Sequence, residues 1–121
     1  MSTLDIVKNK LWFLVADYGF EFCYGDGRGE HFYFSNKNGH IEFYEWDQFK
    51  EFEIRVSTGT YWESIDLSQR YPKFWDEFNQ KHKGIKWWFK DKRHDFWEMI
   101  VNIIKTDIAT ENTVFGLMLV K

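Results

Sequence analysis

Apolar residues near the start of the chain recur at intervals of three and four positions, which is the spacing of one helix face. This spacing predicts a helix over residues 3–18, begun by Ser2 or Thr3 and ended by Gly19, because glycine tolerates a left-handed conformation. The expected core-facing stripe, with its wider margin, consists of Leu4, Val7, Leu11, Trp12, Leu14, Val15 and Tyr18.

After Gly19 the pattern changes to a period of two, and such alternation of apolar with polar residues is typical of strands. Turn residues divide the stretch 20–56 into four expected strands, and the run Asn36-Lys37-Asn38-Gly39 is the clearest hairpin signal in the chain. Residues 61–67 are compatible with a fifth strand. The expected inner side chains are Phe22, Phe32, Phe34, Phe43 and Ile54, and the outer side is marked by Glu42, Glu51, Glu53 and Arg55.

Helical spacing returns in the last third of the chain. Pro72 suits the first turn of a helix that Gly84 ends, and a longer helix opens at Asp91 or Asp95. The segment 85–89 between them fits either a short strand or the approach to the long helix. We expect the apolar tail 114–120 to dock on the core. The apolar stripes of the two helices are Phe74, Trp75 and Phe78 in the first, and Phe96, Met99, Ile100, Ile103 and Ile104 in the second, which Ile108 extends.

This order of elements predicts an α+β fold with an N-terminal helix, a four- to five-stranded antiparallel meander sheet, and C-terminal helices packed on one face. The chain shows no internal repeat, no low-complexity run and no linker, so residues 1–121 are expected to form a single domain. Aromatic residues make up 21% of the sequence, which is enough for a large aromatic core and leaves a surplus that could form a contact patch.

The chain has one cysteine, Cys23, which excludes an intrachain disulfide. The N-terminus lacks the basic start and long apolar run of a signal peptide, and no apolar run has the length of a membrane span. These features predict a cytoplasmic protein. The net charge of −3 argues against general nucleic-acid binding.

No segment carries a motif that names a reaction. The glycines of 25–29 precede a strand instead of a helix, which favours a plain hairpin loop over a phosphate-binding loop. His40 and Glu42 share a strand face with His31 across the hairpin, but a solvated polar face is a simpler interpretation than a metal site. Cys23 is interpreted as a small buried hydrophobe. We therefore expect no enzyme activity, no metal and no cofactor.

The charges divide along the chain. Residues 41–66 carry seven acids and two bases, whereas residues 81–94 carry six bases and one acid. Solvated faces would explain both runs, and two functional interpretations compete with that explanation. In the first, an acidic, aromatic sheet face binds another protein. In the second, the basic segment 81–94 binds nucleic acid, with its bases on phosphates and its aromatic rings stacked on nucleobases.

Each interpretation has its candidate residues. The expected partner-binding residues are Glu42, Tyr44, Trp46, Glu51 and Glu53. The alternative nucleic-acid-binding residues are Lys83, Lys86, Lys90 and Arg93.

The first half of the chain resembles a known class of small proteins. The resemblance lies in a helix ending in Asp17-Tyr18-Gly19-Phe20, followed by Phe32-Tyr33-Phe34-Ser35-Asn36 and the hairpin to Ile41-Glu42-Phe43. This layout is similar to that of small uncharacterised bacterial proteins, many of which are immunity proteins of polymorphic toxin systems. The resemblance implies a non-catalytic cytoplasmic protein that neutralises a partner toxin. It carries over no functional residue.

Overall fold

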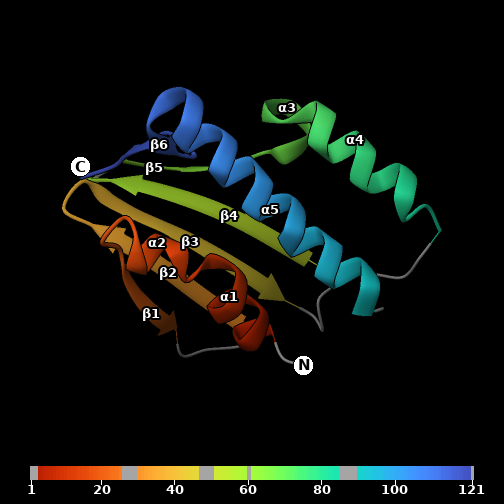
Figure 1. The fold of residues 1–121 in the computed structure, drawn as a ribbon, viewed down its shortest axis with the longest axis horizontal. Helices are drawn as coiled ribbons and strands as arrows, with labels where there is room; N and C mark the ends of the chain where they lie inside the picture. Colours follow the sequence, from red (N-terminus) through yellow and green to blue (C-terminus); the bar gives the residue numbers. More distant parts are fainter. Residues whose placement is uncertain (1–2, 26–29, 47–50, 60, 85–89, 121) are drawn as a thin grey trace.

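The computed structural model describes residues 3–25, 30–46, 51–59, 61–84 and 90–120. Its core is a five-stranded antiparallel sheet with helices packed on one face (Figure 1), which confirms the predicted α+β fold. The order of the strands in the sheet is their order in the sequence, as expected for strands joined by short hairpins. Within the described residues, no helix has the length and apolar character needed to cross a membrane.

The N-terminal helix is present but interrupted. α1 (Thr3–Leu11) and α2 (Phe13–Ala16) are separated at Trp12, and Gly19 follows them with φ 71°, the left-handed conformation predicted for it. Val7, Leu11 and Leu14 are fully buried. The assignment of Trp12 to the buried stripe is wrong, since its side chain is 43% exposed where the helix breaks.

The sheet consists of β1 (Glu21–Gly25), β2 (Glu30–Asn36), β3 (Gly39–Trp46), β4 (Glu51–Thr58) and β5 (Tyr61–Ser64). The predicted hairpin joins β2 to β3, with Asn36 paired to Gly39 across the loop residues Lys37 and Asn38. The Asn36 side chain accepts a hydrogen bond from the Asn38 amide at 2.8 Å. Gly39 has φ 152°, and a Cβ there would lie 2.0 Å from the Ser57 carbonyl oxygen, so only glycine fits.

The strand registers place the predicted inner side chains on one face. Phe22 pairs with Phe34, Phe34 with Ile41, and Ile41 with Val56. In the next inner row, Phe32 pairs with Phe43, and Phe43 with Ile54. The alternation read from the sequence therefore identified the inner face of the sheet correctly.

The helices after the sheet are α3 (Leu67–Arg70), α4 (Pro72–Lys81) and α5 (Lys90–Glu111). The fifth strand ends at Ser64, because Asp66 caps α3 and Leu67 belongs to that helix. All five predicted stripe residues of α5 are buried, together with Trp97, whose ring contacts Phe43 with centroids 5.6 Å apart. The ambiguous segment 85–89 lies outside the described residues.

The chain ends in a short hairpin, β6 (Thr113–Val114) and β7 (Leu117–Met118), that docks on the core as predicted. The buried Asp107 of α5 holds it. Its carboxylate accepts hydrogen bonds from the Tyr71 hydroxyl at 2.6 Å and from the Phe115 amide at 3.1 Å. Burial and the hydrogen bond to Asp107 raise the pKa of Tyr71 well above its usual value.

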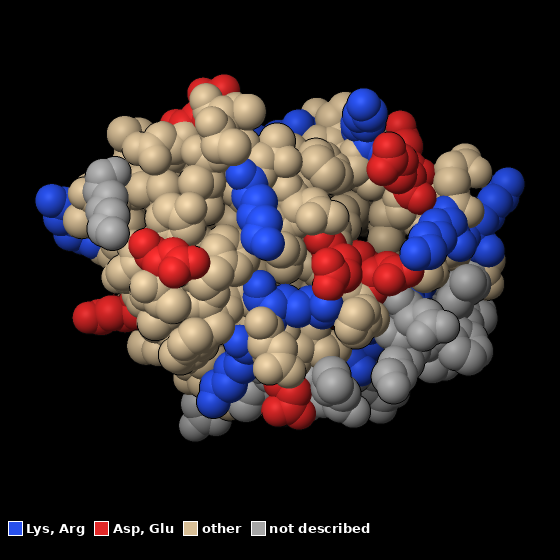
Figure 2. All heavy atoms as spheres, viewed as in Figure 1, with Lys and Arg blue, Asp and Glu red and all other residues tan. Residues whose placement is uncertain are grey.

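Charges on the helical side of the molecule are mixed. Figure 2 shows acidic and basic side chains interspersed over the layer that contains α1 and α5. Several of them form ion pairs between helices: Lys10 of α1 contacts Glu98 of α5, and Lys81 of α4 contacts Asp95 of α5 at 2.8 Å. Over the described residues, this layer therefore carries both signs of charge side by side.

Candidate functional site

The face of the sheet opposite the helices is open, since no described helix lies over it (Figure 1). We call it the outer face. The registers bring its residues into three rows across the strands. The rows are Glu21, Ser35, His40, Ser57 and Trp62; then Cys23, Tyr33, Glu42, Arg55 and Ser64; then His31, Tyr44 and Glu53.

Glu42 lies at the centre of the outer face. One of its carboxylate oxygens is 2.7 Å from His40 Nε2, and the other accepts a hydrogen bond from the Tyr44 hydroxyl and lies 3.6 Å from His31 Nε2. Burial opposes ionisation of this carboxyl, but the hydrogen bonds from Tyr44 and His40 outweigh burial and lower its pKa. Glu42 is thus ionised, and its carboxylate already interacts with neighbouring side chains of the outer face.

Tyr44 is fixed on both sides. Its ring stacks on His31 with centroids 4.0 Å apart and planes 16° apart, while the Arg55 guanidinium lies 4.8 Å from its centroid. Burial, followed by the hydrogen bond to Glu42, raises the pKa of Tyr44 to about 12. Tyr44 therefore stays protonated and acts as a hydrogen-bond donor near neutral pH.

Arg55 connects the centre of the face to its edge. Its guanidinium lies 4.8 Å from the rings of both Tyr44 and Trp62 and forms an ion pair with Glu53 at 3.0 Å. Trp62 is 55% exposed, so one side of its indole ring packs on Arg55 while much of the ring remains open to solvent. The result is a row of flat side chains held in place by one another.

Three of the five predicted partner-binding residues, Glu42, Tyr44 and Glu53, lie on the outer face. Glu42, Tyr44 and Glu53 have the contacts given above. Trp46 pairs in register with Glu51 at the end of the same two strands, while their side chains lie outside the described part of the chain.

Two sequence interpretations of this region need correction. The outer side is not a uniform acidic field: Glu45 is buried on the inner side, 2% exposed, and Glu42 and Glu53 are paired with groups of the face itself. Cys23 is exposed instead of buried, because its position in β1 has the parity of Tyr33 and Glu42. The error at Cys23 comes from judging the residue by its sequence neighbours instead of by strand parity.

The contacts within the cluster were not predicted. These are the stacking of His31 on Tyr44 and the packing of Arg55, which was placed on the outer side, against the rings of Tyr44 and Trp62. A signal was present for His31. A two-residue loop at Lys37-Asn38 fixes the register of β2 on β3, and that register alone places His31 opposite Tyr44.

Comparison of this chain with models of protein families, with characterised proteins and with solved structures finds no match. The geometry of the chain therefore carries the functional argument.

The alternative nucleic-acid residues are only partly described. Lys83 is exposed just after α4, and Arg93 is half-buried in the first turns of α5. Lys86 lies outside the described residues, as does the side chain of Lys90. The neighbouring Lys81 shares the Asp95 carboxylate with His82, and these two contacts lower the pKa of Asp95, Lys81 having the larger effect.

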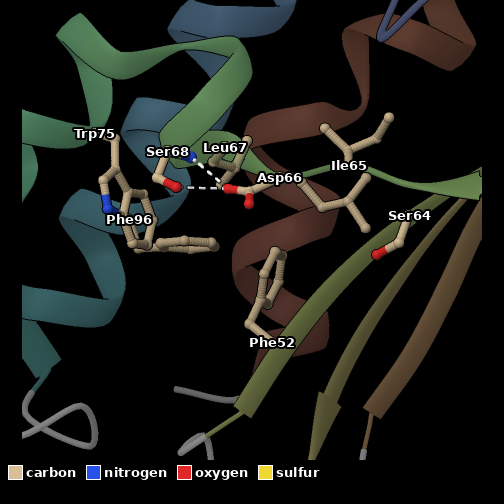
Figure 3. Close-up of a pocket in the computed structure, with 9 residues that line it drawn as sticks. Phe52, Ser64, Ile65, Asp66, Leu67, Ser68, Trp75 and Phe96 are labelled. Atoms are coloured by element: carbon tan, nitrogen blue, oxygen red, sulfur yellow. Dashed lines mark hydrogen bonds between the residues drawn. The ribbon is translucent and has the colours of Figure 1, made fainter.

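A cleft lies at the β5 edge of the sheet, between the start of β4, the segment from β5 to α3, and the helices α4 and α5 (Figure 3). Its volume is about 470 Å³. It is lined by Phe52, Ile54, Ser64, Ile65, Asp66, Leu67, Ser68, Trp75 and Phe96. Within the described part of the chain, no three His, Cys, Asp or Glu side chains converge as metal ligands, here or on the outer face.

Proposed function

We propose that this chain is a non-catalytic protein-binding domain and that the outer face of its sheet is the binding surface. The supporting observation is the row of His31, Tyr44, Arg55 and Trp62, whose rings and guanidinium are stacked on one another on an open sheet. Tyr, Trp and Arg are the residues that contribute most to binding energy in protein interfaces.

The ordering of these side chains favours tight association. Immobilising a flexible side chain on binding costs roughly 0.5–1.5 kcal/mol, and a side chain already held by its neighbours avoids most of that cost. Arg55 is held by two rings and one carboxylate, and Tyr44 by His31, Glu42 and Arg55. The face therefore offers a partner a rigid aromatic surface.

The proposed partner is a protein toxin, and the chain neutralises it by covering its active surface. The resemblance to immunity proteins suggests this partner class. The acidic charge of the face is not the main feature for a partner to recognise, since the central carboxylates of Glu42 and Glu53 already have partners within the face. Recognition then depends mainly on ring stacking and on hydrogen bonds to exposed atoms, with a smaller contribution from net charge.

The experiment is co-expression of this chain with the product of the toxin-like gene beside its own, followed by affinity capture and a growth assay. We expect a complex and rescue of growth. Trp62→Ala and Tyr44→Ala should each weaken the complex by roughly tenfold or more, as expected for a central interface residue.

Trp12→Ala is the matched control. Trp12 is also an exposed tryptophan, 43% against 55% for Trp62, but it belongs to the helical layer. It should leave the affinity within about twofold of the unmodified chain, as expected for a residue outside the interface. The proposal fails if neither a complex nor rescue is seen, or if Trp12→Ala weakens binding more than Trp62→Ala does.

A further inference from the structure

The cleft beside α4 has the composition of a small-molecule site. Six apolar side chains of the described residues line it, and three of them are aromatic: Phe52 from β4, Trp75 from α4 and Phe96 from α5. Its volume of about 470 Å³ falls within the range of roughly 300–1,000 Å³ that is usual for sites of small ligands. Figure 3 shows these rings around the space that Asp66 faces.

Asp66 places one carboxylate at this apolar space. Its Oδ1 accepts three hydrogen bonds, from the Ser68 amide at 3.0 Å, the Ser68 hydroxyl at 2.6 Å and the Gln69 amide at 3.3 Å. No hydrogen bond from another described residue reaches Oδ2. The carboxylate is therefore fixed in direction by the start of α3 while one oxygen remains free to accept a donor.

The charge state of the cleft follows from the same contacts. The hydrogen bond from the Ser68 hydroxyl, with smaller contributions from the two amides, lowers the pKa of Asp66, so the group is ionised near neutral pH. Among the described residues, no lysine or arginine lines the cleft. The nearest cation in sequence, Arg70, is 3.7 Å from the Glu63 carboxylate. The cleft thus combines one negative charge with three aromatic rings.

We propose that this cleft binds a small organic cation, an amine with an aromatic or cyclic apolar body. Its ammonium donates to Asp66 Oδ2 in a charge-assisted hydrogen bond, and the ring faces nearby attract the same positive charge. The apolar body of the ligand fills the space between Phe52, Trp75 and Phe96, where it is removed from water.

A small molecule fits this site better than a lysine of a protein partner. A lysine brings a single thin chain of methylene groups, which would leave most of the aromatic walls uncovered in a cleft of this volume. The cleft is lined by the inner-face residues Phe52 and Ile54 of β4, whereas the cluster around Glu42 lies on the outer face of the sheet. The inference is therefore independent of the proposed protein-binding function, and either one stands if the other fails.

The test is a titration of the isotope-labelled protein with 2-phenylethylamine, followed by amide and indole NMR shifts. We expect saturable shifts at residues 64–68 and at the Trp75 indole. The neutral 2-phenylethanol, which has the same body, should bind roughly tenfold more weakly because it lacks the charge. The anion 3-phenylpropionate should not bind.

Asp66→Asn is the decisive variant, because asparagine also caps helices well and leaves α3 intact. It should weaken amine binding roughly tenfold and leave 2-phenylethanol binding unchanged. Glu63→Gln is the matched control: it removes a nearby acid outside the cleft and should change the amine affinity by less than about twofold.

Three results would overturn the proposal. The first is the absence of saturable shifts at residues 64–68. The second is an equal loss of amine affinity in Glu63→Gln and Asp66→Asn. The third is tighter binding of N-acetyl-lysine amide than of 2-phenylethylamine, which would assign the cleft to a protein side chain.

Discussion

The inner and outer faces of the sheet are built from the same five strands, yet their side chains are held in place by different interactions. On the inner face, Phe34, Ile41 and Phe43 are fully buried against the helices. On the outer face, Tyr44, Arg55 and Trp62 are ordered by stacking and hydrogen bonds while they remain in contact with solvent. On the inner face, burial of apolar area stabilises the fold. On the outer face, contacts between neighbouring side chains hold those side chains in place.

This contrast shows that the residues of the core and the residues of the outer surface are separated by strand parity. Alternation along a strand sends neighbouring residues to opposite faces, so Phe43 can serve the core while Tyr44 serves the surface. Substitutions one position apart should therefore have unrelated effects. Substitutions on the outer face should therefore cost less folding free energy than substitutions on the inner face.

The largest expected effect is that of Phe43→Ala, which should lower the free energy of unfolding by about 3–5 kcal/mol because it opens a cavity beneath Trp97. Trp62→Ala should cost about 1 kcal/mol or less, since this ring loses only an exposed contact with Arg55. Urea unfolding of both variants measures the difference. Equal losses of unfolding free energy in the two variants would mean that the outer face contributes to stability as much as the inner face does.

Asp107→Ala tests whether a buried polar group on the helical side contributes as much to the free energy of unfolding as a core residue does. The change leaves the Tyr71 hydroxyl and the Phe115 amide without their buried acceptor and should cost about 2–3 kcal/mol. Asp107→Asn keeps one acceptor oxygen and should cost less. Thermal unfolding distinguishes the two variants. A larger loss of stability in Asp107→Asn than in Asp107→Ala would contradict the expected order.

Glu42→Gln should cost about 1 kcal/mol at neutral pH, because hydrogen bonds to a carboxylate are stronger than those to an amide. The pKa of Glu42 is lower in the folded chain than its ordinary value of 4.5. The stabilisation is therefore fully present above that value and is lost as the pH falls through the lowered pKa.

The measurement is the difference in unfolding free energy between Glu42→Gln and the unmodified chain as the pH falls from neutral towards 3. We expect the difference to shrink in the acid range. A difference that grows there would show that the carboxylate is not the stabilised form.

Cys23 should give the smallest effect on stability. Cys23→Ser is expected to change the unfolding free energy by no more than about 0.5 kcal/mol, because the side chain is exposed on the outer face. In the native protein the thiol should react with a disulfide reagent without denaturant, and a bound partner should slow that reaction. If the thiol reacted only in the presence of denaturant, Cys23 would be buried in the folded protein.

The sequence predicted the inner face well because period-two alternation and the Asn36–Gly39 turn agree in register. It failed at Cys23, where parity overrides residue type: the apolar cysteine faces out. It also failed at Trp12, because a helical repeat does not reveal where a helix breaks.

The cleft could not be predicted at all. Phe52, Asp66, Trp75 and Phe96 come from four separate segments, and no local pattern indicates that they meet. The same holds for the network of Asp107, since its partners Tyr71 and Phe115 lie in different elements. Features of this kind depend on tertiary packing, which a single sequence reports only indirectly.

Hydrogen bonds join the β2–β3 loop to the β6–β7 hairpin, and they affect when the folded structure can form during synthesis. The side chains of Asn36 and Asn38 both donate to the Met118 carbonyl, across 82 and 80 positions of the chain. Val114, Phe115 and Leu117 complete the core from the same tail. During synthesis, the hairpin that is made early must therefore wait for residues that leave the ribosome much later, and in that interval its aromatic face is open to chaperones.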